Sequence, residues 1–189
     1  LEQIIERYPE DYSISHYDFS MEDSVKVGKF TDAWGVVWEN LYEGLAGIPK
    51  EHPLETWDAF EDYELPDPLS DERFEQVERK IKEGGCDGYM SVGSISLFER
   101  MQALRGFENL MVDMLSHKEQ FHKLARAITN YNLEQIKRWS ETPVDEILLS
   151  DDWGTQARVM ISPQLWEELF QPYYSEMCDA IHRSGKYVQ

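Results

Sequence analysis

Apolar side chains recur every three or four residues in four segments in the second half of the chain. This spacing places them on one face of a helix, so each segment is predicted to be an amphipathic helix. The segments cover residues 70–83, 94–105, 117–141 and 163–184. One apolar face per helix is typical of helices that pack on a larger core. The last segment contains Pro172, whose missing N–H and bulky ring predict a kink.

Residues that commonly cap helices stand near the starts of three of these segments. Ser94 is the predicted N-cap of the second helix. Ser116 and Glu119 have the spacing of a capping box, which predicts the start of the third helix. Ser162 followed by Pro163 predicts the start of the fourth, because a proline at the first helical position loses no hydrogen bond.

Short β-prone runs lie between and after these helices, at residues 88–93, 146–152 and 186–189. The run Ile147–Leu149 is continuously apolar and bounded by charge, as a fully buried parallel strand would be. Strands that alternate with helices predict parallel strands joined by right-handed crossovers, so the fold class is α/β. A closed eight-stranded barrel takes about 250 residues. With three visible strands, this chain is predicted to form an incomplete barrel.

The first part of the chain shows no steady period. Gly35 stands between two β-prone runs, which predicts a hairpin over residues 30–40. Residues 54–63 predict a short helix, followed by a strap bounded by prolines. We therefore expect residues 1–69 to be an irregular segment that covers one end of the core, and residues 70–189 to contain the βα units.

Composition narrows the classes of partner. The chain has 37 acidic and 18 basic residues, a formal charge of −19, which repels phosphate backbones and anionic lipid. No run approaches the roughly 18 uncharged apolar residues of a membrane span, and no signal-peptide pattern opens the chain. Cys86 and Cys178 have no close Cys or His partner, which indicates a reducing, cytoplasmic setting. The five histidines are scattered, so no metal site is expected from this chain alone.

Four segments, taken in order, resemble the uroporphyrinogen decarboxylase superfamily. They are HPLETWDAFEDYELPDP, LFERMQALRGFENLMVDML, SDDWGTQ and ISPQLWEELFQPYYSEMCDAIHRSGKYV. The resemblance runs from about Thr31 to Gln189 and is most specific where DDWGTQ is followed, four residues later, by ISP and then Trp166. It implies a TIM-type (β/α) barrel enzyme, of which this chain contains the N-terminal part. It also implies a site at the carboxyl ends of the strands.

The superfamily includes uroporphyrinogen decarboxylases, which act in porphyrin biosynthesis, and methyltransferases that use a corrinoid. The decarboxylases carry an arginine-rich segment that receives substrate carboxylates, and here Arg7-Tyr8-Pro9-Glu10 is its only echo. A polycarboxylate substrate needs such cations, so we favour methyl transfer, with decarboxylation as the alternative. The substrate is then a small molecule or a corrinoid protein. A third possibility is a non-catalytic barrel fragment that binds or assembles through its open edge.

The resemblance also concerns cofactors. The methyltransferases hold zinc with a His-x-Cys pair that follows the strand starting here at Lys186. We therefore expect no cofactor within this chain, and zinc together with a corrinoid partner in the full-length protein. We further expect self-association through the open edge of the barrel, because an unpaired strand exposes its backbone groups.

Candidate site residues follow the predicted strands. Asp151 and Asp152 come directly after a buried strand and are the candidate catalytic residues, because barrel chemistry clusters at strand ends. Burial against a neighbouring ring would raise the pKa of such a carboxyl. The candidate substrate-binding residues are Trp153, Gln156, Phe98, Met101 and Arg105.

Overall fold

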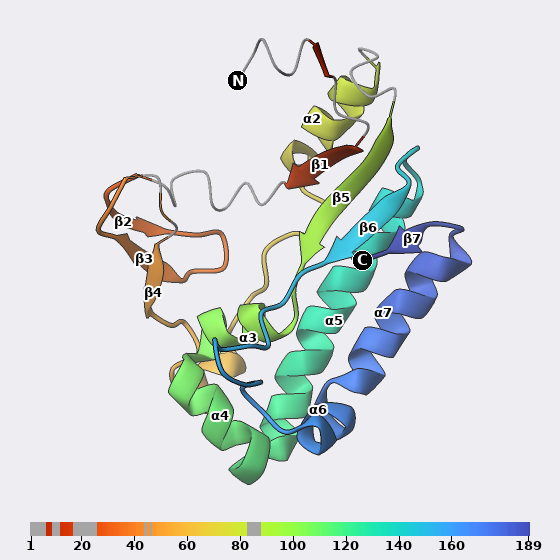
Figure 1. Cartoon of the computed structure of the whole chain (residues 1–189). Coiled ribbons are helices and arrows are strands. Elements are labelled where there is room, and N and C mark those ends of the chain that lie inside the picture. Colours follow the sequence, from red (N-terminus) through yellow and green to blue (C-terminus); the bar gives the residue numbers. More distant parts are fainter. Residues whose placement is uncertain (1–6, 9–11, 17–25, 44, 46, 83–87) are drawn as a thin grey trace.

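A parallel four-stranded sheet forms the centre of the molecule in the computed structural model, which describes residues 7–8, 12–16, 26–43, 45, 47–82 and 88–189 (Figure 1). Its strands are β1 (Tyr12–His16), β5 (Tyr89–Ile95), β6 (Glu146–Leu149) and β7 (Tyr187–Val188). Their order is β1-β5-β6-β7, and every neighbouring pair is parallel. The three strands predicted from the sequence are therefore confirmed as parallel neighbours, and β1 is an additional strand.

Side chains alternate between the two faces of this sheet. Val92 and Ile147 are neighbours in the register and have no exposed surface, because they belong to the hydrophobic core. Ser91 and Glu146 are also register neighbours but lie on the opposite face, where the Ser91 hydroxyl donates to the Glu146 carboxylate at 2.8 Å. The sheet thus has one apolar and one polar face.

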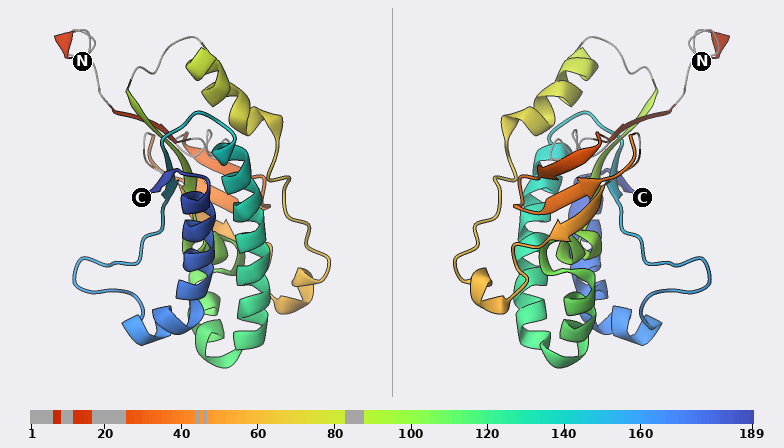
Figure 2. Two further views of the ribbon diagram at one scale, coloured as in Figure 1. Left: turned by 90° about the vertical axis from the view of Figure 1, so that its right-hand side faces the viewer. Right: turned by 90° about the vertical axis from the view of Figure 1, so that its left-hand side faces the viewer.

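Two long helices, α5 (Lys118–Ser140) and α7 (Gln171–Arg183), lie side by side along the sheet (Figures 1 and 2). Their predicted apolar stripes are confirmed, since Phe121, Ile128 and Ile181 have no exposed surface. The kink predicted at Pro172 is a full interruption of the helix, because α6 (Pro163–Leu169) ends before α7 begins and Pro172 lies in the first turn of α7. A further helix, α2 (Asp71–Lys82), precedes β5.

None of the helices in the described part of the chain is both long and apolar enough to cross a membrane.

Helices α3 (Phe98–Arg105) and α4 (Phe107–Ser116) follow the carboxyl end of β5 and meet at a glycine corner. Gly106 there has φ of +83°, a conformation that favours glycine. A Cβ on it would lie 3.2 Å from the His52 ring. Both the backbone conformation and the close approach of the histidine therefore require a residue without a side chain.

Two of the three predicted N-caps are wrong, although α5 begins at Lys118, next to its predicted start at residue 117. Ser94 does not cap a helix but lies within β5, where it has φ of +90° beside a shift in the strand register. Ser116 ends α4, and α5 starts from His117, which makes no side-chain capping bond. The third start is confirmed, because the Ser162 hydroxyl accepts a hydrogen bond from the backbone N–H of Leu165 at 3.2 Å.

A second sheet, antiparallel, contains β2 (Gly28–Thr31), β3 (Val37–Asn40) and β4 (Ile48–Glu51) in that order. The predicted hairpin is confirmed as β2 and β3, but the prediction of an irregular segment over residues 1–69 missed β1 and β4. The hairpin turn is held by the buried side chain of Asp32. Its carboxylate accepts hydrogen bonds from the backbone N–H groups of Trp34 and Val36, both at 2.9 Å.

This small sheet is joined to the rest of the fold through polar and aromatic contacts. Arg100 of α3 pairs with Asp32 at 3.3 Å and lies over the ring of Trp34. That ring in turn packs on Tyr131 of α5. After β4 the chain makes one 3-10 turn, η2 (Trp57–Phe60), where a longer helix was predicted, and then runs as an extended strap to α2.

Candidate active site

Asp151 lies just beyond β6 and caps the N-terminus of α3, a helix that lies about 50 residues earlier in the sequence. One carboxylate oxygen accepts the backbone N–H groups of Leu97 (2.8 Å) and Phe98 (3.2 Å). The other accepts the N–H of Glu99 at 2.7 Å, and the Tyr174 hydroxyl donates to the same carboxylate. A carboxylate satisfies unpaired amides well at a helix N-terminus. Asp151 therefore joins the loop after β6 to the start of α3. It lies at the carboxyl ends of the strands, as the sequence analysis predicted.

Burial raises the pKa of Asp151, and the hydrogen bonds from the backbone amides and from Tyr174 only partly oppose it. Burial also raises the pKa of Tyr174, and the Asp151 carboxylate adds to that shift. The phenol therefore keeps its proton and donates a hydrogen bond to the carboxylate. The pKa of Glu99 is also raised, first by burial and then by the charges of Asp151 and Asp152. The charges of both aspartates thus act on Glu99 at this end of the sheet.

Asp152 stands in a different environment from its neighbour. Its side chain is exposed, and its carboxylate accepts the backbone N–H of Gly154 at 2.8 Å. Gln156 is exposed further along the same loop, which spans residues 150–162. Of the two predicted catalytic carboxylates, Asp152 is therefore the one open to a ligand.

Aromatic rings stand beside the two aspartates. Trp153 stacks on Phe98 with ring centroids 4.1 Å apart and contacts the edge of Phe170 at 4.7 Å. Trp166 and Tyr174 stack on each other at 5.9 Å, and both lie within 6.5 Å of the Trp153 ring. These rings come from α3, the loop and the α6–α7 corner. Together they form a partly exposed aromatic wall next to Asp152.

Two of the predicted substrate contacts belong to the core instead. Phe98 and Met101 have no exposed surface, so neither is open to a ligand in this structure, and Phe98 packs under Trp153. The apolar stripe of α3 was the evidence for both, and a stripe of this kind is equally typical of core packing.

Arg105 is also held inside the protein. Its guanidinium donates to Asp113 at 2.7 Å and to the carbonyl of Leu54 at 2.9 Å, and it lies over the Trp57 ring. The same Asp113 carboxylate accepts from the Trp57 indole at 3.1 Å and contacts the His117 ring at 2.9 Å. Arg105 is therefore bound to an internal carboxylate, and the prediction that it receives a substrate anion is not supported.

The sequence analysis missed Glu99 and Tyr174, both of which contact the predicted aspartates. Tyr174 follows Phe170 by four residues and so lies on the face that α7 turns toward the core. That spacing alone does not show that its hydroxyl meets a carboxylate from another βα unit. Among the described residues, no group of three or more His, Cys, Asp or Glu side chains is arranged to hold a metal ion. Cys86 lies outside the described residues, and Cys178 is half-buried on α7.

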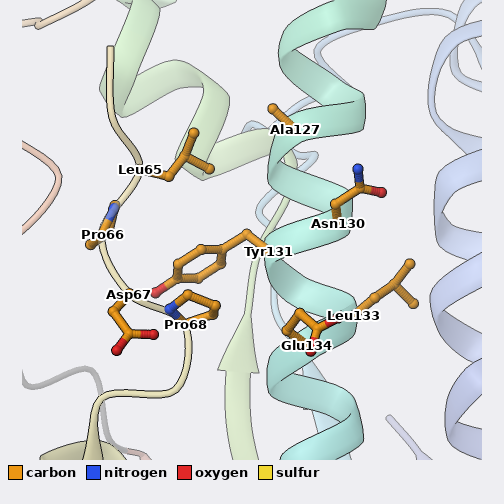
Figure 3. Close-up of a pocket in the computed structure, with 9 residues that line it drawn as sticks. All are labelled: Leu65, Pro66, Asp67, Pro68, Ala127, Asn130, Tyr131, Leu133 and Glu134. Carbon is orange, nitrogen blue, oxygen red and sulfur yellow. The ribbon is translucent and has the colours of Figure 1, made fainter.

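A separate groove of about 570 Å³ lies between the strap and α5 (Figure 3). In this view the Tyr131 ring extends from α5 toward the two prolines of the strap. The lining residues are Leu65, Pro66, Asp67, Pro68, Ala127, Asn130, Tyr131, Leu133 and Glu134. No residue predicted for the site is among them, so this groove is distinct from the candidate active site.

Comparison with known proteins places the fold. No curated protein matches the chain. A solved methyltransferase from Methanosarcina mazei superposes with a TM-score of 0.69 at 11% sequence identity, covering 99% of this chain and 52% of that one. The chain therefore spans about half the length of that structure, and its α/β fold is a partial TIM-type barrel, as predicted. The family model for uroporphyrinogen decarboxylase (URO-D) matches residues 46–189. The chain belongs to the uroporphyrinogen decarboxylase family.

Proposed function

We propose that the full-length protein is a barrel enzyme that transfers a methyl group between a corrinoid and a small acceptor, and that Asp152 contacts the reacting molecules. The charge balance at the carboxyl ends of the strands carries this proposal. Glu99, Asp151 and Asp152 gather there, and Arg158 is the one cation in the loop over residues 150–162. A porphyrinogen with many carboxylates would meet mainly like charge, which disfavours its binding.

The arginines of α3 strengthen this argument. Arg100 is paired with Asp32, and Arg105 with Asp113, and both pairs are largely buried. Releasing either arginine toward a substrate would leave a carboxylate unpaired inside the protein, which costs several kcal/mol. Neither cation is therefore suited to bind substrate carboxylates. The solved methyltransferase with the same fold is consistent with methyl transfer but supports the fold only.

The two aspartates are proposed to act differently. Asp152 is exposed beside the aromatic wall, where its carboxylate can accept a hydrogen bond or a proton from a bound molecule. Asp151 positions that wall, because it ties the start of α3 to the loop and to Tyr174. Trp153 and Gln156 complete the proposed substrate contacts from the same loop.

Zinc and a corrinoid are proposed as cofactors of the full-length protein. The described residues of this chain are not proposed to bind zinc. The described side chains offer no set of three metal ligands, so no step is assigned to zinc here. A bound corrinoid would supply the methyl group. This chain would supply an aromatic surface and a carboxylate beside it.

An assay of the full-length protein with two substrates tests the proposal. Methylcobalamin with a thiol acceptor should yield the S-methyl product, followed by the loss of methylcobalamin absorbance, and metal analysis should find one zinc per chain. Uroporphyrinogen supplied alone should release no carbon dioxide. Metal-free decarboxylation of uroporphyrinogen without methyl transfer would reject methyl transfer in favour of the alternative.

A non-catalytic assembly role is the second candidate, and the open sheet favours it. Within the described residues, β7 pairs with β6 alone, so one side of β7 has backbone groups without a strand partner. Exposed edges of this kind promote self-association. Sedimentation of the chain over a range of concentrations should then show reversible association. A monomer at every concentration would argue against this role.

A further inference from the structure

Helix α4 turns an apolar face toward solvent. Leu110 and Met114 are buried against the core, as expected for the inner side of an amphipathic helix. The outer side carries Phe107, Val112 and Leu115, whose exposed fractions are 46%, 53% and 71%. A helix that faces water on one side usually carries polar residues there. The outer side of α4 is therefore suited to contact with another molecule.

The spacing of these residues has the geometry of a helix-packing surface. Phe107, Met111 and Leu115 are four residues apart and form one ridge along the helix, with Val112 beside it. Ridges of this spacing pack into the grooves of a second helix. We call Phe107, Met111, Val112 and Leu115 the α4 face. Helix α4 lies at the end of the molecule toward which β5 points (Figure 1), near the candidate active site.

The surroundings of the α4 face are acidic. Glu108 is exposed on α4 itself, and the exposed Glu55 lies alongside, since its carbonyl accepts from the Asn109 side chain. The nearby cations are already engaged, because Arg105 is buried against a carboxylate, Lys118 is paired with a glutamate of α6, and Lys123 is paired with Glu119. An apolar surface with an acidic rim is complementary to a partner with an apolar centre and a basic rim.

We propose that the α4 face binds a basic amphipathic helix of a partner protein. Apolar side chains of the partner would pack between Phe107, Met111 and Leu115, and its lysines or arginines would lie over the acidic rim. A second copy of this chain fits less well, because it brings the same acidic rim and a formal charge of −19. The inference holds whichever reaction the full-length protein performs.

A designed peptide serves as the probe. It is a helix of about 18 residues, since shorter helices are marginal in water, with leucines on one face and lysines on the others. Fluorescence anisotropy should show saturable binding of the labelled peptide to the chain. A peptide of identical composition but scrambled order, and one with glutamate in place of lysine, should bind at least tenfold more weakly. If the scrambled peptide binds equally well, or if no binding occurs, the proposal is wrong.

Two variants separate apolar docking from simple charge attraction. Leu115→Ala removes apolar surface, and Val112→Glu adds an acid to the α4 face. Both should weaken peptide binding about tenfold, because burial of one such side chain is worth roughly that factor. Attraction by charge alone predicts the opposite for Val112→Glu, namely tighter binding, and that result would overturn the proposal.

The control variant is Leu69→Glu, which changes an exposed leucine just before α2, outside α3 and α4. It should bind the peptide as the natural chain does, and circular dichroism should show the same helix content in all variants. Sedimentation gives the last check. A dimer of the natural chain that Leu115→Ala abolishes would assign the α4 face to self-association and overturn the choice of a basic partner.

Discussion

Two aspartates in different regions of the molecule, the half-buried Asp151 and the buried Asp113, are held in opposite ways. Asp151, beyond β6, receives neutral donors: the backbone amides that start α3 and the Tyr174 hydroxyl. Asp113, on α4, receives the charged guanidinium of Arg105 together with an indole and an imidazole. The first carboxylate stands next to two further acids, whereas the second stands next to a cation.

The difference separates a positioning contact from a stabilising one. Burial without a cation raises the pKa of Asp151, and the hydrogen bonds from its neighbours then set how far it rises. At Asp113 the carboxylate pairs with a cation, and the contact joins η2, α3 and α4 into one unit. Perturbed carboxyl groups are typical of functional sites, and compensated pairs are typical of structural ones. The four predictions below test that division.

The largest effect should come from Arg105→Met, which keeps the apolar stem and removes the charge. Asp113 would then be a buried carboxylate without its cation, so the free energy of unfolding should fall by about 3–5 kcal/mol. Urea denaturation measures this loss. The double variant Arg105→Met with Asp113→Leu should recover much of it, since both charges are then gone. A double variant no more stable than the single one would contradict the role of the ion pair.

Asp151→Asn should have the next largest effect. The amide carries donors where three backbone N–H groups need acceptors, so the free energy of unfolding should fall by about 1–3 kcal/mol. The pH dependence has a defined sign. Folding raises the pKa of Asp151, so its contribution is fully present below the unfolded value of about 4 and is lost as pH rises through the folded value.

The natural chain should therefore lose stability relative to the Asp151→Asn variant as pH rises through that window. Denaturation of both proteins at a series of acidic pH values measures this difference. A difference that stays constant with pH, or grows as the solution becomes more alkaline, would show that Asp151 does not titrate as its burial implies.

Tyr174→Phe should cost less, about 1 kcal/mol, because one hydrogen bond is lost and the ring still packs in the aromatic wall. Loss of that donor should raise the pKa of Asp151 further, since the Tyr174 hydrogen bond lowers it. Titration of the Asp151 carboxyl carbon by nuclear magnetic resonance checks the direction. A fall in that pKa would exclude the proposed contact.

The smallest change in stability should follow Asp152→Asn, under about 0.5 kcal/mol, as for most surface substitutions. Removal of this charge should lower the pKa of Glu99, because Asp152 is one of the groups that raise it. In the full-length enzyme the same variant should lose at least about 100-fold in turnover if Asp152 transfers a proton. Full activity would make Asp152 a structural carboxylate.

The fold was largely predictable because its periodic signals are local. The stripes of α5 and α7 and the apolar run of β6 each lie within one segment, so their spacing alone identified them. Strand β1 was missed because the run YSISH is only five residues long and its partner is β5, far along the chain. β4 was missed because Pro49 lies inside it, and proline argues against a strand.

The site was predictable in position but not in role. The location of Asp151 and Asp152 after a strand correctly placed them beside the start of α3. Ser94 and Ser116 were wrongly predicted to be helix caps, because α3 is capped by Asp151 from another βα unit and α5 starts without a side-chain cap. Contacts between distant segments, such as Arg105 with Leu54, leave no mark on local sequence.

The pairing of β1 with β5 has a consequence for synthesis on the ribosome. Residues 12–16 emerge first, but they pair with residues 89–93, after the small sheet and α2 have been made. At typical translation rates this leaves β1 without its partner for on the order of 4–15 seconds. The units from β5 to β7 connect neighbouring segments, and local contacts form faster than distant ones. β1 is therefore expected to join last, and a nascent chain halted before β5 should expose it to proteases and chaperones.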